Sequence, residues 1–348
     1  MPIIHSKNLQ NDTRETLGHL HFDRLFVLTD QTTFRLCWPL LSGMPRLASA
    51  WMITIGPTDE NKTLDSLVHV WSELQKGGAT RHSLLLNVGG GMVTDLGGFA
   101  ASTFKRGIAF INIPTTLLSQ VDASVGGKTG INFGGLKNEI GVFRQADAVI
   151  ISGKFLHSLD MPNLLSGYAE MLKHGLISDE ESLVDLLRFD IEEPDLAGLE
   201  RLVEKSVGIK KHIVEQDPTE KGLRKALNLG HTAGHALESL ALERGEPVLH
   251  GYAVAWGLIC ELYLSTWKCG FPKDCFRQVV QFIREHYAGY PLDCKQYDRL
   301  LEFMSHDKKN DATGINFTLL GAVGDIRINQ KATKEEIFEM LDFLSFKL

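Results

Sequence analysis

Residues 84–138 read LLLNVGGGMVTDLGGFAASTFKRGIAFINIPTTLLSQVDASVGGKTGINFGGLKN, and this stretch decides the fold class. The apolar run Leu84–Val88 is typical of a buried strand, and it leads directly into Gly89, Gly90 and Gly91. Small residues suited to a close-packed helix follow Asp95. A strand, a glycine turn and a helix in this order can bring backbone N–H groups close to a phosphate. The stretch therefore predicts a phosphate or nucleotide loop in an α/β domain.

A second turn follows in the same stretch. The apolar run Ile108–Ile113 ends at Pro114, and the hydroxyls of Thr115 and Thr116 come next. Asp122 and a glycine-rich loop at residues 126–130 follow. The glycines match neither GxGxxG nor GxxxxGK[ST], and a glycine cluster after a strand is as often an ordinary turn. Glycines alone thus predict a phosphate or nucleotide loop and nothing narrower.

The composition is that of a globular enzyme. The chain has 348 residues, enough for two domains, with 43% hydrophobic and 23% charged residues. A net charge of −7 argues against a nucleic-acid or anionic-membrane partner. No apolar run reaches the roughly 18 residues of a membrane span, and the first residues lack an apolar signal core. The five cysteines form no CxxC pair, so we expect free thiols and a cytoplasmic protein.

Two domains follow from the periodicity. Buried strands are predicted at Leu25–Asp30, Trp51–Ile55, Leu84–Val88, Ile108–Ile113 and Ala148–Ile151. Helical spacing between them predicts a Rossmann-like α/β domain with a mostly parallel sheet over residues 1–152. Ligands of such sheets bind beyond the carboxyl ends of the strands, where both glycine turns fall.

The second domain, residues 153–348, is predicted to be all-α. Apolar residues recur there at periods of three and four in Leu164–Ile177, Glu181–Arg188, Leu199–Glu215, Thr232–Leu242, Tyr252–Trp267 and Phe276–His286. Residues 333–336, TKEE, predict a capping box before a last helix.

A possible metal site lies in this helical half. Glu170 and Lys173 share one helix face, and His231 and His235, four apart, share another. A carboxylate with neutral imidazoles is the ligand set of a catalytic zinc site. A single histidine is more often structural, and spacing alone favours His231 and His235 as the ligand pair. It does not choose between His174 and His250 as a further ligand.

Six motifs together resemble the 3-dehydroquinate synthase family. They are residues 89–132, GLKNEIGVF at 135–143, SGYAEMLKHG at 166–175, DPTEKGLRKALNLGHTAGHALE at 217–238, LHG at 249–251 and HDKKN at 306–310. Their order and spacing match across roughly residues 84–310, which makes the resemblance far more specific than any single motif.

The resemblance implies an NAD-binding α/β domain, a helical metal-binding domain and an active site between them. The implied ligands of Zn²⁺ (or Co²⁺) are Glu170, His231 and His250, in place of the pair that spacing favours. His235 is instead implied in proton transfer. The other residues with implied catalytic roles are Lys128, Asp122, Lys173 and Glu220.

The resemblance also implies the remaining contacts. Substrate binding falls on Arg106, Asn138, Lys210, Arg224, Asn228 and Lys308. NAD binding falls on Asp59, Lys62, Gly91, Met92, Val93, Thr94, Asp95, Thr115, Thr116, Lys128, Lys137, Phe155 and Ser158. Arg106 matches a position that reaches the phosphate in the neighbouring subunit, which implies a homodimer. Several cations suit a substrate that carries both a carboxylate and a phosphate.

The implied reaction converts 3-deoxy-D-arabino-heptulosonate 7-phosphate to 3-dehydroquinate in the shikimate pathway. NAD⁺ oxidises an alcohol, phosphate is eliminated, NADH returns its hydride, and an intramolecular aldol step closes the carbocycle. A metal held by these ligands would polarise the alcohol that is oxidised. Three alternatives remain at this stage: a sister sugar phosphate cyclase such as 2-deoxy-scyllo-inosose synthase, a metal-dependent polyol dehydrogenase, and a non-catalytic nucleotide- and metal-binding protein.

Overall fold

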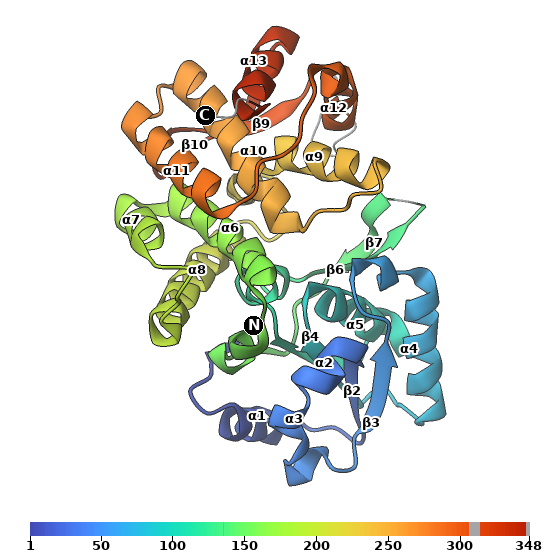
Figure 1. The fold of residues 1–348 in the computed structure, drawn as a ribbon. Helices are drawn as coiled ribbons and strands as arrows, with labels where there is room; N and C mark the ends of the chain where they lie inside the picture. Colours follow the sequence, from blue (N-terminus) through green and yellow to red (C-terminus); the bar gives the residue numbers. More distant parts are fainter. Residues whose placement is uncertain (135, 306–313, 346–348) are drawn as a thin grey trace. The chain divides into compact units, whose positions relative to one another are not determined.

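The computed structural model describes residues 1–134, 136–305 and 314–345, and the chain forms two compact units (Figure 1). Unit 1 comprises Met1–Asp160 and Leu196–Val207, and unit 2 comprises Met161–Asp195 and Gly208–Leu348. The change of periodicity in the sequence predicts the division near residue 152. In the structure, unit 1 runs on to Asp160 and also takes in a later segment of the chain.

Unit 1 is built on a six-stranded sheet with the order β1-β8-β5-β4-β2-β3. The strands are β1 (Ile3–His5), β2 (Leu25–Asp30), β3 (Trp51–Ile55), β4 (Leu84–Gly89), β5 (Ala109–Pro114) and β8 (Ala148–Ile151). Every neighbouring pair in this sheet is parallel. The predicted parallel α/β domain is confirmed, with β1, a strand of three residues, as an addition.

Helices bury both faces of this sheet, which explains the continuous apolar runs. One face packs on α1 (Leu9–Gly18), α2 (Gln31–Leu36) and α3 (Pro39–Ser42), in a core that contains Leu17, Val27, Leu41, Leu86 and Ile111. The helices α4 (Leu64–Lys76) and α5 (Gly91–Thr103) contact the sheet strands β3, β4 and β5. The carboxyl ends of β4 and β5 consequently stand next to each other, with Gly89 paired to Pro114.

A two-stranded antiparallel hairpin interrupts this pattern. It consists of β6 (Lys128–Phe133) and β7 (Leu136–Phe143). The predicted loop at residues 126–130 is therefore wrong in part, because Lys128, Thr129 and Gly130 belong to a strand. Gly130 and Gly141 face each other, and a Cβ on Gly130 would lie 2.5 Å from the Ile140 carbonyl oxygen. The glycine here allows close strand pairing.

Unit 2 is mainly helical, as predicted. Its helices are α6 (Met161–Ser178), α7 (Glu180–Arg188), the second part of α8 (Leu196–Gln216), α9 (His231–Glu243), α10 (His250–Leu264), α11 (Lys273–His286), α12 (Tyr297–Ser305) and α13 (Lys334–Ser345). The capping box before α13 is present, since Thr333 N–H donates to Glu336 and Glu336 N–H donates to Thr333 Oγ1. An antiparallel pair, β9 (Asn316–Ala322) and β10 (Asp325–Lys331), was not anticipated.

Within the described residues, no helix has both the length and the apolar character needed to cross a bilayer.

Candidate metal centre and cofactor loop

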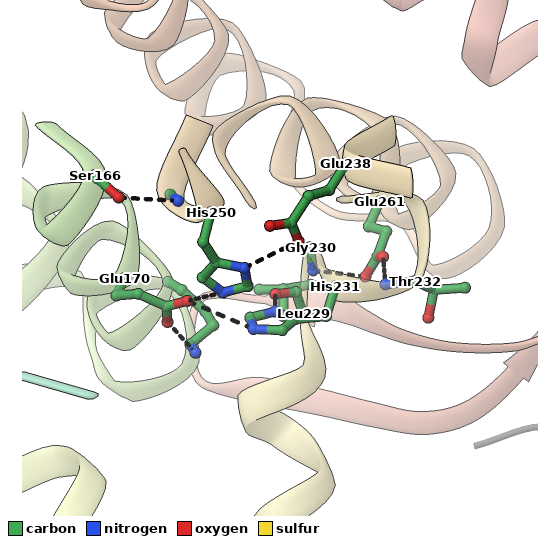
Figure 2. Close-up of polar contacts among 11 residues, drawn as sticks. Ser166, Glu170, Leu229, Gly230, His231, Thr232, Glu238, His250 and Glu261 are labelled. Atoms are coloured by element: carbon green, nitrogen blue, oxygen red, sulfur yellow. Dashed lines mark hydrogen bonds and ion pairs between the residues drawn. The ribbon is translucent and has the colours of Figure 1, made fainter. Parts of the chain in front are cut away.

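Three helices of unit 2 bring a carboxylate and two imidazoles together (Figure 2). Glu170 lies in α6, and His231 and His250 are the first residues of α9 and α10. Glu170 Oε1 lies 3.5 Å from His231 Nε2 and 3.4 Å from His250 Nε2. The three side chains thus converge on one point, although the chain separates them widely.

Glycines permit this convergence by letting the helix backbones approach closely. A Cβ on Gly251, at the start of α10, would lie 1.8 Å from the Ser166 carbonyl oxygen of α6. A Cβ on Gly257 would lie 1.9 Å from the Gly230 carbonyl oxygen, just before α9. No L side chain fits at such distances, so these two glycines fix how near α10 lies to α6 and to the start of α9.

Glu170 is held ionised in a fully buried position. Its Oε2 pairs with Lys173, one turn later on α6, and both side chains are almost inaccessible to solvent. Burial alone would raise the pKa of Glu170, but the charges of Lys173, His250 and His174 outweigh it. The pKa therefore lies below its ordinary value, and the carboxylate is ready to bind a cation.

Both histidine rings are oriented by a partner at Nδ1, the ring nitrogen that does not face Glu170. His231 Nδ1 lies 3.1 Å from the Leu229 carbonyl oxygen, which can only accept, so Nδ1 carries a hydrogen, and in the neutral ring Nε2 is then the atom with the lone pair for a metal. His250 Nδ1 lies 3.4 Å from Glu238 Oε2. Partners of this kind support histidines that bind metals.

The residues fit a zinc ion. Glu170 Oε1 is buried and has no hydrogen-bond partner, yet it faces the two Nε2 atoms. An ionised oxygen in such a position is costly unless a cation or a proton satisfies it. One carboxylate and two imidazoles match the ligand chemistry of catalytic zinc.

His235 lies in the same group. The rings of His231 and His235 are 5.2 Å apart, and ligand atoms of His231, His235 and His250 lie within 4.8 Å of one another. The pair that spacing favoured is thus brought together, and His250 joins it. Proximity to the metal position suits either a further ligand or a group that moves a proton.

Buried cations and a folded loop belong to the same unit. Lys173, Lys210 and Arg224 are all buried. The Asp217 carboxylate accepts from the backbone N–H groups of Lys221, Gly222 and Arg224, and these bonds lower its pKa. Glu220 accepts from the Asn228 amide at 2.9 Å. Charged groups are seldom buried in this number unless they serve partners or ligands.

In unit 1, the expected cofactor turn joins β4 to α5. Gly90 stands at the N-cap position with extended backbone and no capping side chain, so the first N–H groups of α5 face outward from the helix end. Gly91, Met92, Val93 and Thr94 form the first turn of α5. A Cβ on Gly90 would lie 3.2 Å from Thr116, and one on Gly89 would lie 2.5 Å from Val93. This turn has the form of a phosphate-binding helix start.

Lys62 links two of the predicted residues. Its side chain is buried, and Nζ donates to Asp95 Oδ2 at 2.6 Å and to Asn138 Oδ1 at 2.5 Å. Burial raises the pKa of Asp95 although the Lys62 charge opposes it. Asn138 has a positive φ of 51°, a conformation that asparagine tolerates better than most residues. Lys62 therefore holds β7 and α5 in a fixed relation within unit 1.

The other predicted residues of unit 1 lie as follows. After the end of β5, Thr115 is buried and the Thr116 hydroxyl donates a hydrogen bond to Ser119 Oγ. Asp122 lies in a π-helical turn, and Lys128 is the first residue of β6. The Lys137 ammonium lies 3.5 Å from the Asp59 carboxylate, and Arg106 is exposed. Phe155 is part of the sheet core, and Ser158 donates to its carbonyl, so contact with a cofactor there would involve the backbone of Phe155. Lys308 lies outside the described residues.

Three supporting residues of unit 2 were not predicted from the sequence: Ser166, Glu238 and Glu261. Ser166 Oγ accepts from Gly251 N–H, and Glu261 accepts from the start of α9. A signal existed for the two glutamates. Glu238 follows His235 by three residues, and Glu261 is a lone charge in the apolar run of α10.

Comparisons with known proteins point to one family. The family model described as 3-dehydroquinate synthase N-terminal matches residues 52–166, and that described as 3-dehydroquinate synthase C-terminal matches residues 167–310. A 3-dehydroquinate synthase of Parabacteroides distasonis is 52% identical over 341 residues, which cover 98% of this chain and 97% of that protein.

Two solved structures share the fold. A 2-epi-5-epi-valiolone synthase of Streptomyces hygroscopicus with NAD⁺ and Zn²⁺ bound gives a TM-score of 0.87 at 25% identity, over 99% of this chain and 96% of that one. A 2-deoxy-scyllo-inosose synthase complexed with carbaglucose-6-phosphate, NAD⁺ and Co²⁺ gives 0.87 at 21% identity, over 97% and 95% of the two chains.

Proposed function

The chain belongs to the 3-dehydroquinate synthase family, and from this premise we propose that it converts 3-deoxy-D-arabino-heptulosonate 7-phosphate to 3-dehydroquinate and phosphate. The structural observation that carries the proposal is the buried Glu170 oxygen without a hydrogen bond, facing His231 and His250. The reaction belongs to the shikimate pathway of aromatic amino acid biosynthesis. Its net result is loss of phosphate without net oxidation, so the enzyme is a carbon–oxygen lyase.

We assign Glu170, His231 and His250 as the ligands of Zn²⁺ or Co²⁺. A metal bound there would polarise the substrate hydroxyl that is oxidised. Leu229 and Glu238 hold the two imidazoles in orientation, as their contacts with Nδ1 indicate. His235 is close enough to this cluster to take or return a proton near the metal.

The remaining assignments follow the chemistry of the side chains. Lys173, Lys210, Arg224 and Asn228 of unit 2 bind the anionic and hydroxyl groups of the substrate, with Glu220 holding Asn228 in place. In unit 1, the start of α5, Lys62, Asp95, Thr115 and Thr116 bind NAD, which takes up and returns a hydride in each turnover. Asp122, Lys128 and Asn138 are assigned to the substrate.

The test is phosphate release from 3-deoxy-D-arabino-heptulosonate 7-phosphate by the purified protein with Zn²⁺ and NAD⁺, while NADH is followed by its absorbance. We expect equal amounts of phosphate and 3-dehydroquinate and no accumulation of NADH. No phosphate from this substrate, with metal and cofactor bound, would favour a sister cyclase, which a panel of hexose phosphates would identify. NADH accumulation with glycerol would favour a polyol dehydrogenase.

We also propose a homodimer in which Arg106 of one subunit contacts the substrate phosphate bound by the other. Arg106 is exposed and has a positive φ of 68°, so the protein holds a strained, outward-facing arginine. Arg106→Ala is expected to lower kcat/KM about ten- to a hundredfold, the effect of one lost charge-assisted bond, and to leave NAD affinity unchanged. Steady-state kinetics and NAD titration measure the two effects.

Mixing variants tests whether the arginine acts across subunits. After exchange of subunits, Arg106→Ala mixed with the inactive His250→Ala should regain activity, because one site of the mixed dimer has both residues. The control is Arg106→Ala mixed with the double variant, which should regain none. Equal activity in both mixtures, or unchanged kinetics of Arg106→Ala alone, would contradict the shared site.

A cytoplasmic location is a further proposal. It is supported by the five cysteines, all of which are free thiols, two of them buried.

A further inference from the structure

Helix α9, which begins with His231, has no cap of its own. Its N-cap residue, Gly230, is in the left-handed conformation with φ 79° and has no side chain that could accept from the first N–H groups. Glu261 of α10 accepts these hydrogens instead (Figure 2). Its Oε2 accepts from Gly230 N–H at 2.7 Å, and its Oε1 accepts from Thr232 and Ala233 N–H at 2.9 and 3.1 Å.

Glu261 is fully buried within an otherwise apolar helix. A carboxylate in such a place is costly unless several donors satisfy it, and three backbone N–H groups at a helix N-terminus do so. Gly257, one turn earlier on α10, touches the Gly230 carbonyl and keeps the two helices at contact distance. Glu261 is thus held in place by its hydrogen bonds to the start of α9 and by the close contact of α10 with Gly230.

The peptide group between Leu229 and Gly230 connects Glu261 to the metal centre. Its N–H donates to Glu261 Oε2, and its carbonyl accepts from His231 Nδ1 at 3.1 Å. Because the N–H and C=O of one peptide are coplanar, the carboxylate that fixes one end also fixes the other. The orientation of the His231 ring therefore depends on a side chain that does not touch it.

Glu261 and His250 also share α10, three turns apart. Helix α10 thus carries the proposed ligand His250 at its start. Three turns later it carries Glu261, whose carboxylate binds the start of α9, the helix that begins with the proposed ligand His231.

We infer that Glu261 is a positioning residue, which sets the place and the ring orientation of His231 for metal binding. The inference rests on the proposed metal site. The variant Glu261→Gln keeps the size of the side chain, but one of its two terminal atoms becomes an NH₂ donor facing N–H donors. Either the Leu229–Gly230 peptide or the first turn of α9 must then move.

The experiment measures zinc affinity by competition with a chromophoric chelator, using the full-length protein, together with the visible spectrum of the Co²⁺-loaded form. Glu261→Gln is expected to bind zinc about 10- to 100-fold more weakly, as for other partners behind a metal-binding histidine, and to shift the Co²⁺ bands. The matched control is Tyr290→Phe. It removes the buried hydrogen bond that the Tyr290 hydroxyl donates to the carbonyl oxygen of Leu237. Leu237 lies in α9, beyond the first turn of that helix. This control should lower Tm and leave zinc affinity and the Co²⁺ spectrum unchanged.

Zinc affinity and Co²⁺ bands of Glu261→Gln equal to those of the unaltered protein would overturn the inference, whatever the change in Tm. If Glu261→Gln does not fold, Glu261→Asp replaces it, since the charge is kept and only the reach is shortened. Unaltered zinc affinity and Co²⁺ bands in that variant would overturn the inference equally. Failure of the unaltered protein to bind one zinc per chain would contradict the metal site itself, and so the proposed function.

Discussion

Glu170→Gln is expected to lose zinc and to destabilise the folded chain in one step. The amide cannot supply an anionic ligand, so zinc affinity should fall by more than about a hundredfold. The same change leaves Lys173 buried next to a neutral group, and breaking a buried ion pair in this way costs about 3–5 kcal/mol. Elemental analysis of zinc and denaturant unfolding of the metal-free protein measure the two effects separately.

His250→Ala is the matched comparison. Its ring is 29% exposed, and its removal leaves no lysine without its carboxylate, so the metal-free variant should lose less stability than metal-free Glu170→Gln. Zinc and activity should be lost as completely as in Glu170→Gln. Full zinc content in His250→Ala would show that this histidine is not a ligand. Equal stability of metal-free Glu170→Gln and the unaltered protein would show that the pair with Lys173 is dispensable.

Gly251→Ala is expected to damage the metal centre without touching any ligand. The added Cβ would lie 1.8 Å from the Ser166 carbonyl oxygen and 2.4 Å from its carbon, both backbone atoms of α6. Neither atom can turn aside, so α6 and α10 must separate, and Glu170 must separate from His250. We expect a loss of about 1–3 kcal/mol or more in the free energy of unfolding and a zinc affinity at least about tenfold weaker.

Gly208→Ala provides the control for this substitution. Gly208 lies inside α8, and a Cβ there meets nothing within 4 Å. Because alanine favours the helix, this variant should gain about 0.5–1 kcal/mol and bind zinc normally. Calorimetry measures the stability of both variants, and competition with a chelator measures their zinc affinity. Unimpaired zinc binding by Gly251→Ala would mean that the spacing of α6 and α10 does not set the metal site.

The sequence predicts the fold well where one physical signal dominates. Runs such as Leu84–Val88 are apolar except for Asn87 because the parallel strands are covered on both faces, and the glycines after Val88 mark the place where β4 ends and α5 begins. The pair β9 and β10 was missed since it alternates weakly and lies among helices. Lys128 was expected in a loop because glycines surround it, yet pairing with β7 makes it a strand residue.

The candidate site is predictable only in part. The spacing of His231 and His235 shows one helix face, but nothing local shows that α6 and α10 meet this face. That meeting depends on Gly251 and Gly257, whose close contacts are with backbone distant in the sequence. The family resemblance supplied the missing pairing of Glu170 with His231 and His250. It did not indicate Glu261, which accepts hydrogen bonds from the backbone at the start of α9 and does not contact the metal position.

Helix α8 has a consequence for the order in which the chain folds during its synthesis. Its first part, Leu196–Val207, belongs to unit 1, whereas the residues between Asp160 and Leu196 belong to unit 2. Leu199, Val203 and Val207 are buried, and a Cβ on Gly153 would collide with Glu200, so this part of α8 packs closely against the earlier chain. On the ribosome, the sheet can form once β8 has emerged, but unit 1 remains incomplete, with apolar surface uncovered, until α8 follows. The first part of α8 therefore completes unit 1 when α6 and α7 have already been synthesised. These two helices belong to unit 2, whose remaining residues, from Gly208 onward, have not yet been made.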